Sequence, residues 1–315
     1  MKPWTTLKRA TRGAKLTASQ RLPIGTNVFS LDWDMLIILD SCRVDALRTV
    51  AASGDYEFLD DAELTTMTSV GGSTLEWVAG TFVSRYKSLL ENTALVSANG
   101  WPHRILAERY RPEDRVHFGP ALISWQTVTD NTLGAHIRAW QYGNGRAGFS
   151  GQPQADATTV VDLSIALGRQ QTFDRTIVHI IEPHYPYAAA AREQDKSELS
   201  DIEQHPFDYI RETGDRNSVW DAYLMELRAG LDAVEILLRN FDAKTVLITA
   251  DHGEAFGEWQ TYGHGSGSFQ PAVRRIPVVK TKARDLGTHN PDSKSIQNID
   301  IEDHLRSLGY MSDRT

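Results

Sequence analysis

A short apolar strand that ends in an Asp-His pair constrains the fold of this chain most. Residues 246–250 are followed directly by Asp251, His252, Gly253 and Glu254. An apolar run of this length is typical of a buried parallel strand. Side chains at the carboxyl end of such a strand project into the crevice where open α/β sheets bind ligands. The sequence therefore indicates a ligand or metal site here, with an acid that caps the next helix as the alternative.

Strand-like and helical patterns alternate along the chain. Apolar runs that predict strands lie at 34–40, 94–97, 176–181, 246–250 and 276–279. Helical spacing occurs at 43–52, 74–90, 101–110, 158–172, 218–240 (with Ser218 as the expected N-cap) and 303–308. Pro277 places the last strand at a sheet edge or near its own start. This alternation predicts an α/β fold, with a mostly parallel central sheet flanked by helices.

Two segments show neither pattern. Residues 111–157 are rich in Gly, Pro and polar side chains and predict an irregular excursion, and the polar residues 188–217 predict a surface loop or lid. Neither segment is typical of an interdomain linker. We therefore expect a basic N-terminal segment at 1–30 and a single domain at 31–315.

The charge and the cysteine content exclude several classes of partner. The net charge of −8 at pH 7 argues against nucleic-acid binding, which needs a basic surface. The segment from Lys2 to Lys15 is basic and could touch an anionic membrane surface, with a solvated terminus as the alternative. No stretch approaches the roughly 20 apolar residues of a membrane span. The single cysteine, Cys42, excludes an intrachain disulfide and fits a cytoplasmic location.

The strand at 34–40 also ends in an acid. Asp40 is a natural metal ligand at this position, or else the N-cap of the following helix. Arg43 can pair with a bound anion, with an ordinary surface ion pair as the alternative.

Gly71 and Gly72 precede two hydroxyl residues, Ser73 and Thr74, at a predicted helix start. A helix N-terminus offers free N–H groups and a positive dipole end to an anion. A hydroxyl there can act as a nucleophile if a metal lowers its pKa. A plain cap followed by Glu76 is the alternative.

Histidines occur in two further segments. His179 lies within an apolar run and is interpreted as a core histidine, whereas His184 lies beyond the strand and can donate to an anion or protonate a leaving group. His264 follows the Asp-His pair, and we interpret Glu254 and Glu258, which lie between them, as supporting loop residues.

These motifs together resemble the sulfatase-like branch of the alkaline phosphatase superfamily. The matching pieces are Ile38 to Asp45, the helix start at Ser73 and Thr74, Glu182 to Tyr187, Asp251 to Glu254, and Tyr262 to His264. Their order and rough spacing agree from about residue 34 to residue 279. The resemblance implies an alkaline-phosphatase-like three-layer sandwich that forms one catalytic domain.

The resemblance also implies roles for these residues. Asp40, Asp251 and His252 would bind one divalent metal ion (Mn, Ca or Zn), with the Thr74 oxygen completing the site. The nucleophile would be Thr74, with Ser73 as the rival. His184 and His264 would bind the transferred group and one would protonate the leaving group, while Arg43 and Ser73 would add substrate contacts.

The sequence departs from true sulfatases at the nucleophile. Cys42 lies outside the Cys-x-Pro-x-Arg motif that is converted to formylglycine, so a hydroxyl must attack instead. A phospho-threonine can be hydrolysed by water, whereas a sulfo-threonine has no comparable exit. The chemistry therefore favours phosphate esters or diesters over sulfate esters, as a hydrolase or transferase for small-molecule, glycan-linked or lipid-linked substrates. A phosphoglycerol-type headgroup transferase and a non-catalytic binding protein that keeps the fold are the alternatives.

Overall fold

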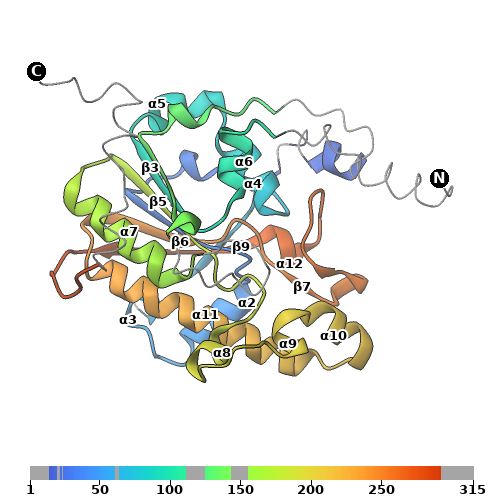
Figure 1. Cartoon of the computed structure of the whole chain (residues 1–315). Helices are drawn as coiled ribbons and strands as arrows, with labels where there is room; N and C mark the ends of the chain where they lie inside the picture. Colours follow the sequence, from blue (N-terminus) through green and yellow to red (C-terminus); the bar gives the residue numbers. More distant parts are fainter. Residues whose placement is uncertain are drawn as a thin grey trace, which may run out of the picture.

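A seven-stranded sheet in the order β2-β9-β6-β1-β5-β3-β4 forms the centre of the molecule (Figure 1). The computed structural model describes residues 14–19, 22, 24–60, 64–110, 125–142 and 155–291. The parallel strands are β1 (Met35–Leu39), β3 (Thr93–Ser97), β4 (Ala135–Arg138), β5 (Arg175–Ile180) and β6 (Ala243–Thr249). β9 (Arg275–Ala283) pairs antiparallel with β6, and β2 (Thr65–Thr68) pairs antiparallel with β9. The predicted mostly parallel α/β sheet is thus confirmed.

Helices cover both faces of the sheet because the buried strands are apolar on both sides. In β1, Met35, Ile37 and Leu39 belong to one core, and Leu36 and Ile38 belong to the other. The first core also includes side chains of α2 (Val44–Ala51), α7 (Ala157–Gln170) and α11 (Arg216–Leu238), and the second includes those of α4 (Thr74–Thr81) and α6 (Trp101–Leu106). Figure 1 shows the two groups of helices on opposite sides of the sheet. Each fully buried Leu or Ile contributes about 1.5–3 kcal/mol relative to an exposed one.

The sheet is wider than the sequence patterns predict. β2 is a short polar strand with no apolar signal, and β4 lies inside the segment 111–157 that we expected to be irregular. β2 pairs with β9, so the edge position that Pro277 suggested for β9 is wrong. Pro277 does lie near the start of β9, and its partner is Thr66 on the short edge strand.

Two helical predictions also need correction. The expected helix at 74–90 is broken after α4, because Val83 bridges to Thr127 and draws the backbone into an extended conformation. α5 (Lys87–Leu90) resumes after this break. α11 begins at Arg216 and not at Ser218, since Asp215 is the residue whose side chain accepts from the Ser218 N–H.

The expected loop at 188–217 instead contains α8 (Ala189–Glu193), α9 (Asp201–Gln204) and α10 (Pro206–Thr213). A capping box formed by Ser200 and Glu203 begins α9, and this signal was available in the sequence. Other short α-helices and strands are α3 (Glu57–Asp60), β7 (Ala255–Phe256), β8 (Tyr262–Gly263) and α12 (Pro271–Arg274). The predicted helix at 303–308 and most of the basic segment at 1–30 lie outside the described residues. Within the described part of the chain, no helix has both the length and the apolar character needed to cross a bilayer.

Candidate metal centre and active site

Two neighbouring strands bring three potential metal ligands together. Asp40 follows β1, and Asp251 and His252 follow β6. Because Ile38 pairs with Thr249, the two aspartates stand side by side, each two residues further along. Asp40, Asp251 and His252 each offer a ligand atom within 4.8 Å of the others, and all three are fully buried.

The chemistry of this cluster fits a divalent cation. Oδ1 of Asp251 accepts from the Ser41 and His252 backbone N–H groups, whereas its Oδ2 has no hydrogen-bond partner among the described residues. The Nδ1–H of His252 can donate to the Gly253 carbonyl at 2.9 Å, which leaves Nε2 free to coordinate a metal. The buried carboxylates of Asp40 and Asp251, whose ligand atoms lie within 4.8 Å of each other, need a positive counter-charge, and a cation would supply it.

The protonation of the cluster follows from burial. Burial and the charge of His264 lower the pKa of His252 to about 3, so the imidazole is neutral and can act as a ligand. Burial opposes ionisation of Asp40, but hydrogen bonding with His179 and the electrostatic attraction of the surrounding histidines hold its pKa well below the usual range. Burial and the Asp40 charge raise the pKa of Asp251, as expected for a second carboxylate beside an ionised one.

Thr74 brings a hydroxyl to the cluster from the start of α4. Its Oγ1 lies 3.4 Å from Oδ2 of Asp40 and 3.3 Å from Nε2 of His252. Ser73 is the N-cap of α4: its Oγ lies 3.4 Å from the Glu76 N–H and 2.8 Å from Oγ of Ser266. The structure therefore places Thr74 beside the candidate ligand cluster and Ser73 at the N-cap of α4.

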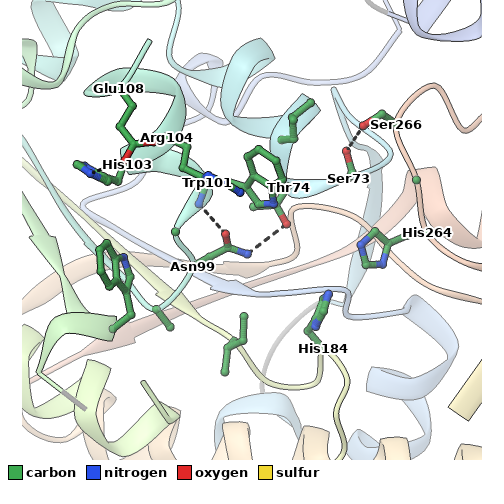
Figure 2. Close-up of a pocket in the computed structure, with 16 residues that line it drawn as sticks. Ser73, Thr74, Asn99, Trp101, His103, Arg104, Glu108, His184, His264 and Ser266 are labelled. Atoms are coloured by element: carbon green, nitrogen blue, oxygen red, sulfur yellow. Dashed lines mark hydrogen bonds and ion pairs between the residues drawn. The ribbon is translucent and has the colours of Figure 1, made fainter. Parts of the chain in front are cut away.

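Asn99 is a site residue that the sequence motifs did not reveal. Its Nδ2 donates to Oδ2 of Asp40 at 2.8 Å and lies 3.4 Å from Oγ1 of Thr74 (Figure 2). Its Oδ1 accepts from the Trp101 backbone N–H, which fixes the amide orientation. Asn99 follows β3, so the rule that ligands bind beyond the carboxyl ends of parallel strands could have identified it.

His179 lies in the buried core, as interpreted from the sequence, but it also contacts the site. Its Nε2 lies 3.3 Å from Oδ2 of Asp40, and its Nδ1 lies 3.3 Å from Oγ of Ser97. The imidazole therefore supports Asp40 from the neighbouring strand β5.

His184 and His264 lie on the other side of Thr74 from Asn99 (Figure 2). Their ring centroids are 5.1 Å apart, and the His264 ring lies 4.2 Å from that of His252. Nδ1 of His264 lies 3.1 Å from both carboxylate oxygens of Glu254, so its Nε2 remains free to donate. Although burial opposes it, the Glu254 carboxylate raises the pKa of His264 to about 9. Both histidines line a pocket of about 600 Å³ together with Ser73, Thr74 and Asn99.

Arg43 does not line this pocket, contrary to the expected substrate contact. Its guanidinium donates to Asp45, to Glu258 and to the Glu254 carbonyl. It also lies 5.2 Å from the ring centroid of Trp220. Because two carboxylates already neutralise this charge, Arg43 acts as an anchor between β1 and the loop that carries Glu254.

Comparison with known proteins supports the fold. No protein-family model matches the sequence, and no curated protein sequence matches it. The structure is similar to the integral membrane lipooligosaccharide phosphoethanolamine transferase A from Neisseria meningitidis, with a TM-score of 0.50 and 13% identity. That match covers 81% of this chain and 48% of the transferase, so this chain spans about half of its length.

Two further solved structures are more distant. The C-terminal periplasmic domain of EptC from Escherichia coli, in complex with Zn, gives a TM-score of 0.44 at 13% identity, over 83% of this chain and 76% of that chain. An alkaline phosphatase superfamily protein from Vibrio parahaemolyticus gives 0.41 at 12% identity, over 90% and 70% respectively. The chain therefore shares its fold with this phosphoethanolamine transferase A, and the layered α/β architecture with a mostly parallel central sheet, which the sequence predicted, is confirmed.

Proposed function

We propose that this protein cleaves phosphate esters or diesters through a covalent phospho-threonine at Thr74, with the help of one divalent cation. The observation that carries the proposal is the position of the Thr74 hydroxyl, within 3.4 Å of Asp40 and 3.3 Å of His252 in a fully buried ligand cluster. Asp40, Asp251 and His252 would hold the cation, and Thr74 Oγ1 would complete the site. When bound, such a cation lowers the pKa of a nearby hydroxyl and neutralises phosphoryl charge.

The residues around Thr74 provide the remaining functions. Thr74 Oγ1 attacks phosphorus and gives up its proton to solvent, and the bond to the departing alcohol breaks. His184 or His264 gives that alcohol a proton. Water then attacks the same phosphorus, the bond to Thr74 breaks, and the Thr74 hydroxyl regains a proton. Asn99 can donate a hydrogen bond to a phosphoryl oxygen throughout.

His264 is well placed to receive a negatively charged group. Its Nδ1 is engaged by Glu254, so Nε2 presents its N–H beside the ring of His252. His184, beside it, lines the same pocket. Two imidazoles opposite a hydroxyl nucleophile suit an in-line displacement at phosphorus, in which charge develops on several oxygens.

A transferase is the second candidate. If an alcohol replaces water in the second step, the phosphoryl group passes to that alcohol. The similarity in fold to a phosphoethanolamine transferase favours this alternative. The pocket of about 600 Å³ also offers space for a second alcohol beside the phosphoryl group.

The experiment that tests the proposal is an acid quench during turnover of an aryl phosphodiester, followed by mass spectrometry of the peptide around Thr74. We expect a phosphoryl adduct on Thr74 that requires a divalent metal and disappears in Thr74→Ala. An adduct on Ser73 would reassign the nucleophile. Cleavage of aryl sulfate with no phosphoester cleavage would contradict the proposal. Adding glycerol or ethanolamine and measuring the new phosphodiester separates transfer from hydrolysis.

A further inference from the structure

The pocket extends well beyond the residues that the proposed phosphoryl chemistry uses. A phosphoryl group fills only a small part of its volume of about 600 Å³. The pocket is also lined by Trp101, His103, Arg104, Glu108 and Trp140, which together are called its far end. Figure 2 shows His103, Arg104 and Glu108 on the side of Thr74 away from His184 and His264. No step of the proposed reaction involves these five side chains, so they are available to recognise another part of the substrate.

Two indole rings supply flat apolar surface at this end. Trp101 comes from α6, and Trp140 comes from the 3-10 helix Ala139–Gln141 that follows β4. Both are half-buried, and both line the pocket. The Arg104 guanidinium lies 5.0 Å from the Trp101 ring centroid, and the His103 ring lies 5.9 Å from the Trp140 ring. Each indole is therefore paired with a hydrogen-bonding side chain.

The charges at this end balance. In the described part of the chain, no carboxylate lies within ion-pair distance of Arg104. Glu108 is largely exposed, and its Oε1 lies 3.4 Å from Nε2 of His103. Burial and the Arg138 charge lower the pKa of His103, which favours the neutral imidazole. The subsite thus offers one cationic donor, one anionic acceptor and one neutral imidazole next to the two indoles.

We propose that this end of the pocket is a subsite for a neutral, hydroxyl-rich ring, such as a sugar, esterified to the phosphoryl group. This inference rests on the proposed function and adds the substrate class to it. Ring C–H faces pack on indoles, while ring hydroxyls can donate to Glu108 and accept from Arg104.

Other groups fit this subsite less well. An ammonium headgroup would meet the positive charge of Arg104 and would be repelled. A second anion would meet Glu108. An acyl chain would remove Arg104 and Glu108 from water without giving them partners, at a free-energy cost.

The test is calorimetric binding to the metal-loaded protein, because binding does not depend on turnover. The probes are inorganic phosphate, phosphoethanolamine, AMP and glucose 1-phosphate. We expect glucose 1-phosphate to bind about tenfold more tightly than inorganic phosphate. Trp140→Ala should remove this advantage while the affinity for inorganic phosphate stays the same. Glu108→Gln should weaken the binding of glucose 1-phosphate and leave that of inorganic phosphate unchanged. Because Glu108 is exposed, this variant should fold normally and tests the subsite even if Trp140→Ala does not fold.

Trp259→Ala is the matched control, since Trp259 is 76% exposed and does not line the pocket. We expect this variant to bind all four probes as the wild type does. Equal affinities for inorganic phosphate and glucose 1-phosphate would overturn the subsite while leaving the phosphoryl site intact. Tighter binding of phosphoethanolamine or AMP than of glucose 1-phosphate would assign the subsite to an ammonium group or a nucleobase and would also overturn the inference. Failure of all four probes to bind would instead contradict the proposed function on which the inference rests.

Discussion

The hydroxyl of Thr74 lies 3.3 Å from Nε2 of His252, although 178 residues separate them in the sequence. α4 begins at Thr74, on the face of the sheet that Leu36 and Ile38 bury, and His252 follows the strand next to β1. The contact therefore depends on two independent pieces of local structure: a helix start and a strand end. Their meeting makes a hydroxyl part of a buried ligand cluster.

The first prediction concerns Thr74. Thr74→Val keeps the shape of the side chain but removes the hydroxyl, so we expect kcat to fall by roughly a thousandfold or more. Thr74→Ser keeps a hydroxyl and should retain measurable turnover. Ser73→Ala removes the N-cap of α4 and should cost about 1 kcal/mol of stability, with a much smaller loss of kcat. Steady-state kinetics and thermal unfolding of the three variants check these outcomes; a Ser73→Ala protein less active than Thr74→Val would contradict them.

The second prediction concerns metal-dependent stability. A cation at a hundred times its Kd stabilises the folded state by about 2.7 kcal/mol, so we expect Mn, Zn or Ca to raise the Tm of the wild type. Asp251→Asn removes one ligand and should abolish this rise. Without metal, this variant should be at least as stable as the wild type, because one of two facing carboxylates is gone.

The matched control for the metal experiment is Asp55→Asn. Asp55 forms an exposed ion pair with Arg228 and is not among the three candidate ligands. Its metal-induced Tm rise should equal that of the wild type in calorimetry with and without chelator. An equal rise in Asp251→Asn would show that the cation binds elsewhere.

The third prediction is a pH dependence of stability that arises from Glu182. Burial and the charge of Glu226 raise the pKa of Glu182 from 4.5 to about 8. Because the folded state holds this proton more tightly than the unfolded state, the contribution to stability is complete below about pH 4.5 and is lost as the pH rises towards 8. Glu182→Gln should remove this contribution and so flatten the plot of unfolding free energy against pH between about pH 4.5 and pH 8.

Denaturant unfolding between pH 5 and pH 9 measures this effect. The difference between Glu182→Gln and the wild type should shift in favour of the variant with rising pH, by about 1.4 kcal/mol per pH unit at most. Glu235→Gln, at a partly exposed position on α11, should run parallel to the wild type. A parallel profile for Glu182→Gln as well would mean that Glu182 is ionised throughout.

The fourth prediction concerns the glycine that precedes the Thr74 helix. A Cβ on Gly71 would lie 2.4 Å from the Trp77 backbone nitrogen and 2.7 Å from the Glu76 backbone carbon. Gly71→Ala must therefore displace the start of α4, and we expect it to destabilise the protein by about 1–3 kcal/mol and to lower kcat. Gly100→Ala meets nothing within 4 Å and should leave Tm nearly unchanged. Equal Tm values for the two variants would show that the start of α4 can move without loss of stability.

Much of the Asp40, Asp251 and His252 cluster could be predicted from the sequence because its signals are local. Asp40 and Asp251 each end an apolar run, and the carboxyl ends of parallel strands lie along the same edge of a sheet. The glycines before Thr74 likewise mark a helix start. The ends of apolar strands and the starts of helices depend on near neighbours in the chain, so they can be predicted without the tertiary structure.

Other features were decided by tertiary contacts. β2 has no apolar pattern and is a strand because β9 offers it an edge to pair with. Asn99 carries no motif, and it becomes a site residue because β3 ends near Asp40 and Thr74. Arg43, which the sequence offers as an anion ligand, is instead committed to Glu258, 215 residues away.

The physical reason for this division is the range of the interactions involved. Apolar periodicity and helix caps are set within a few residues, so the sequence by itself determined the layered α/β architecture and the acids at its strand ends. The contact of Thr74 with His252, the pairing of His264 with Glu254 and the indole rings in the pocket lining depend on which distant segments meet. Those meetings are settled only when the whole core packs, and the tertiary structure alone decided them.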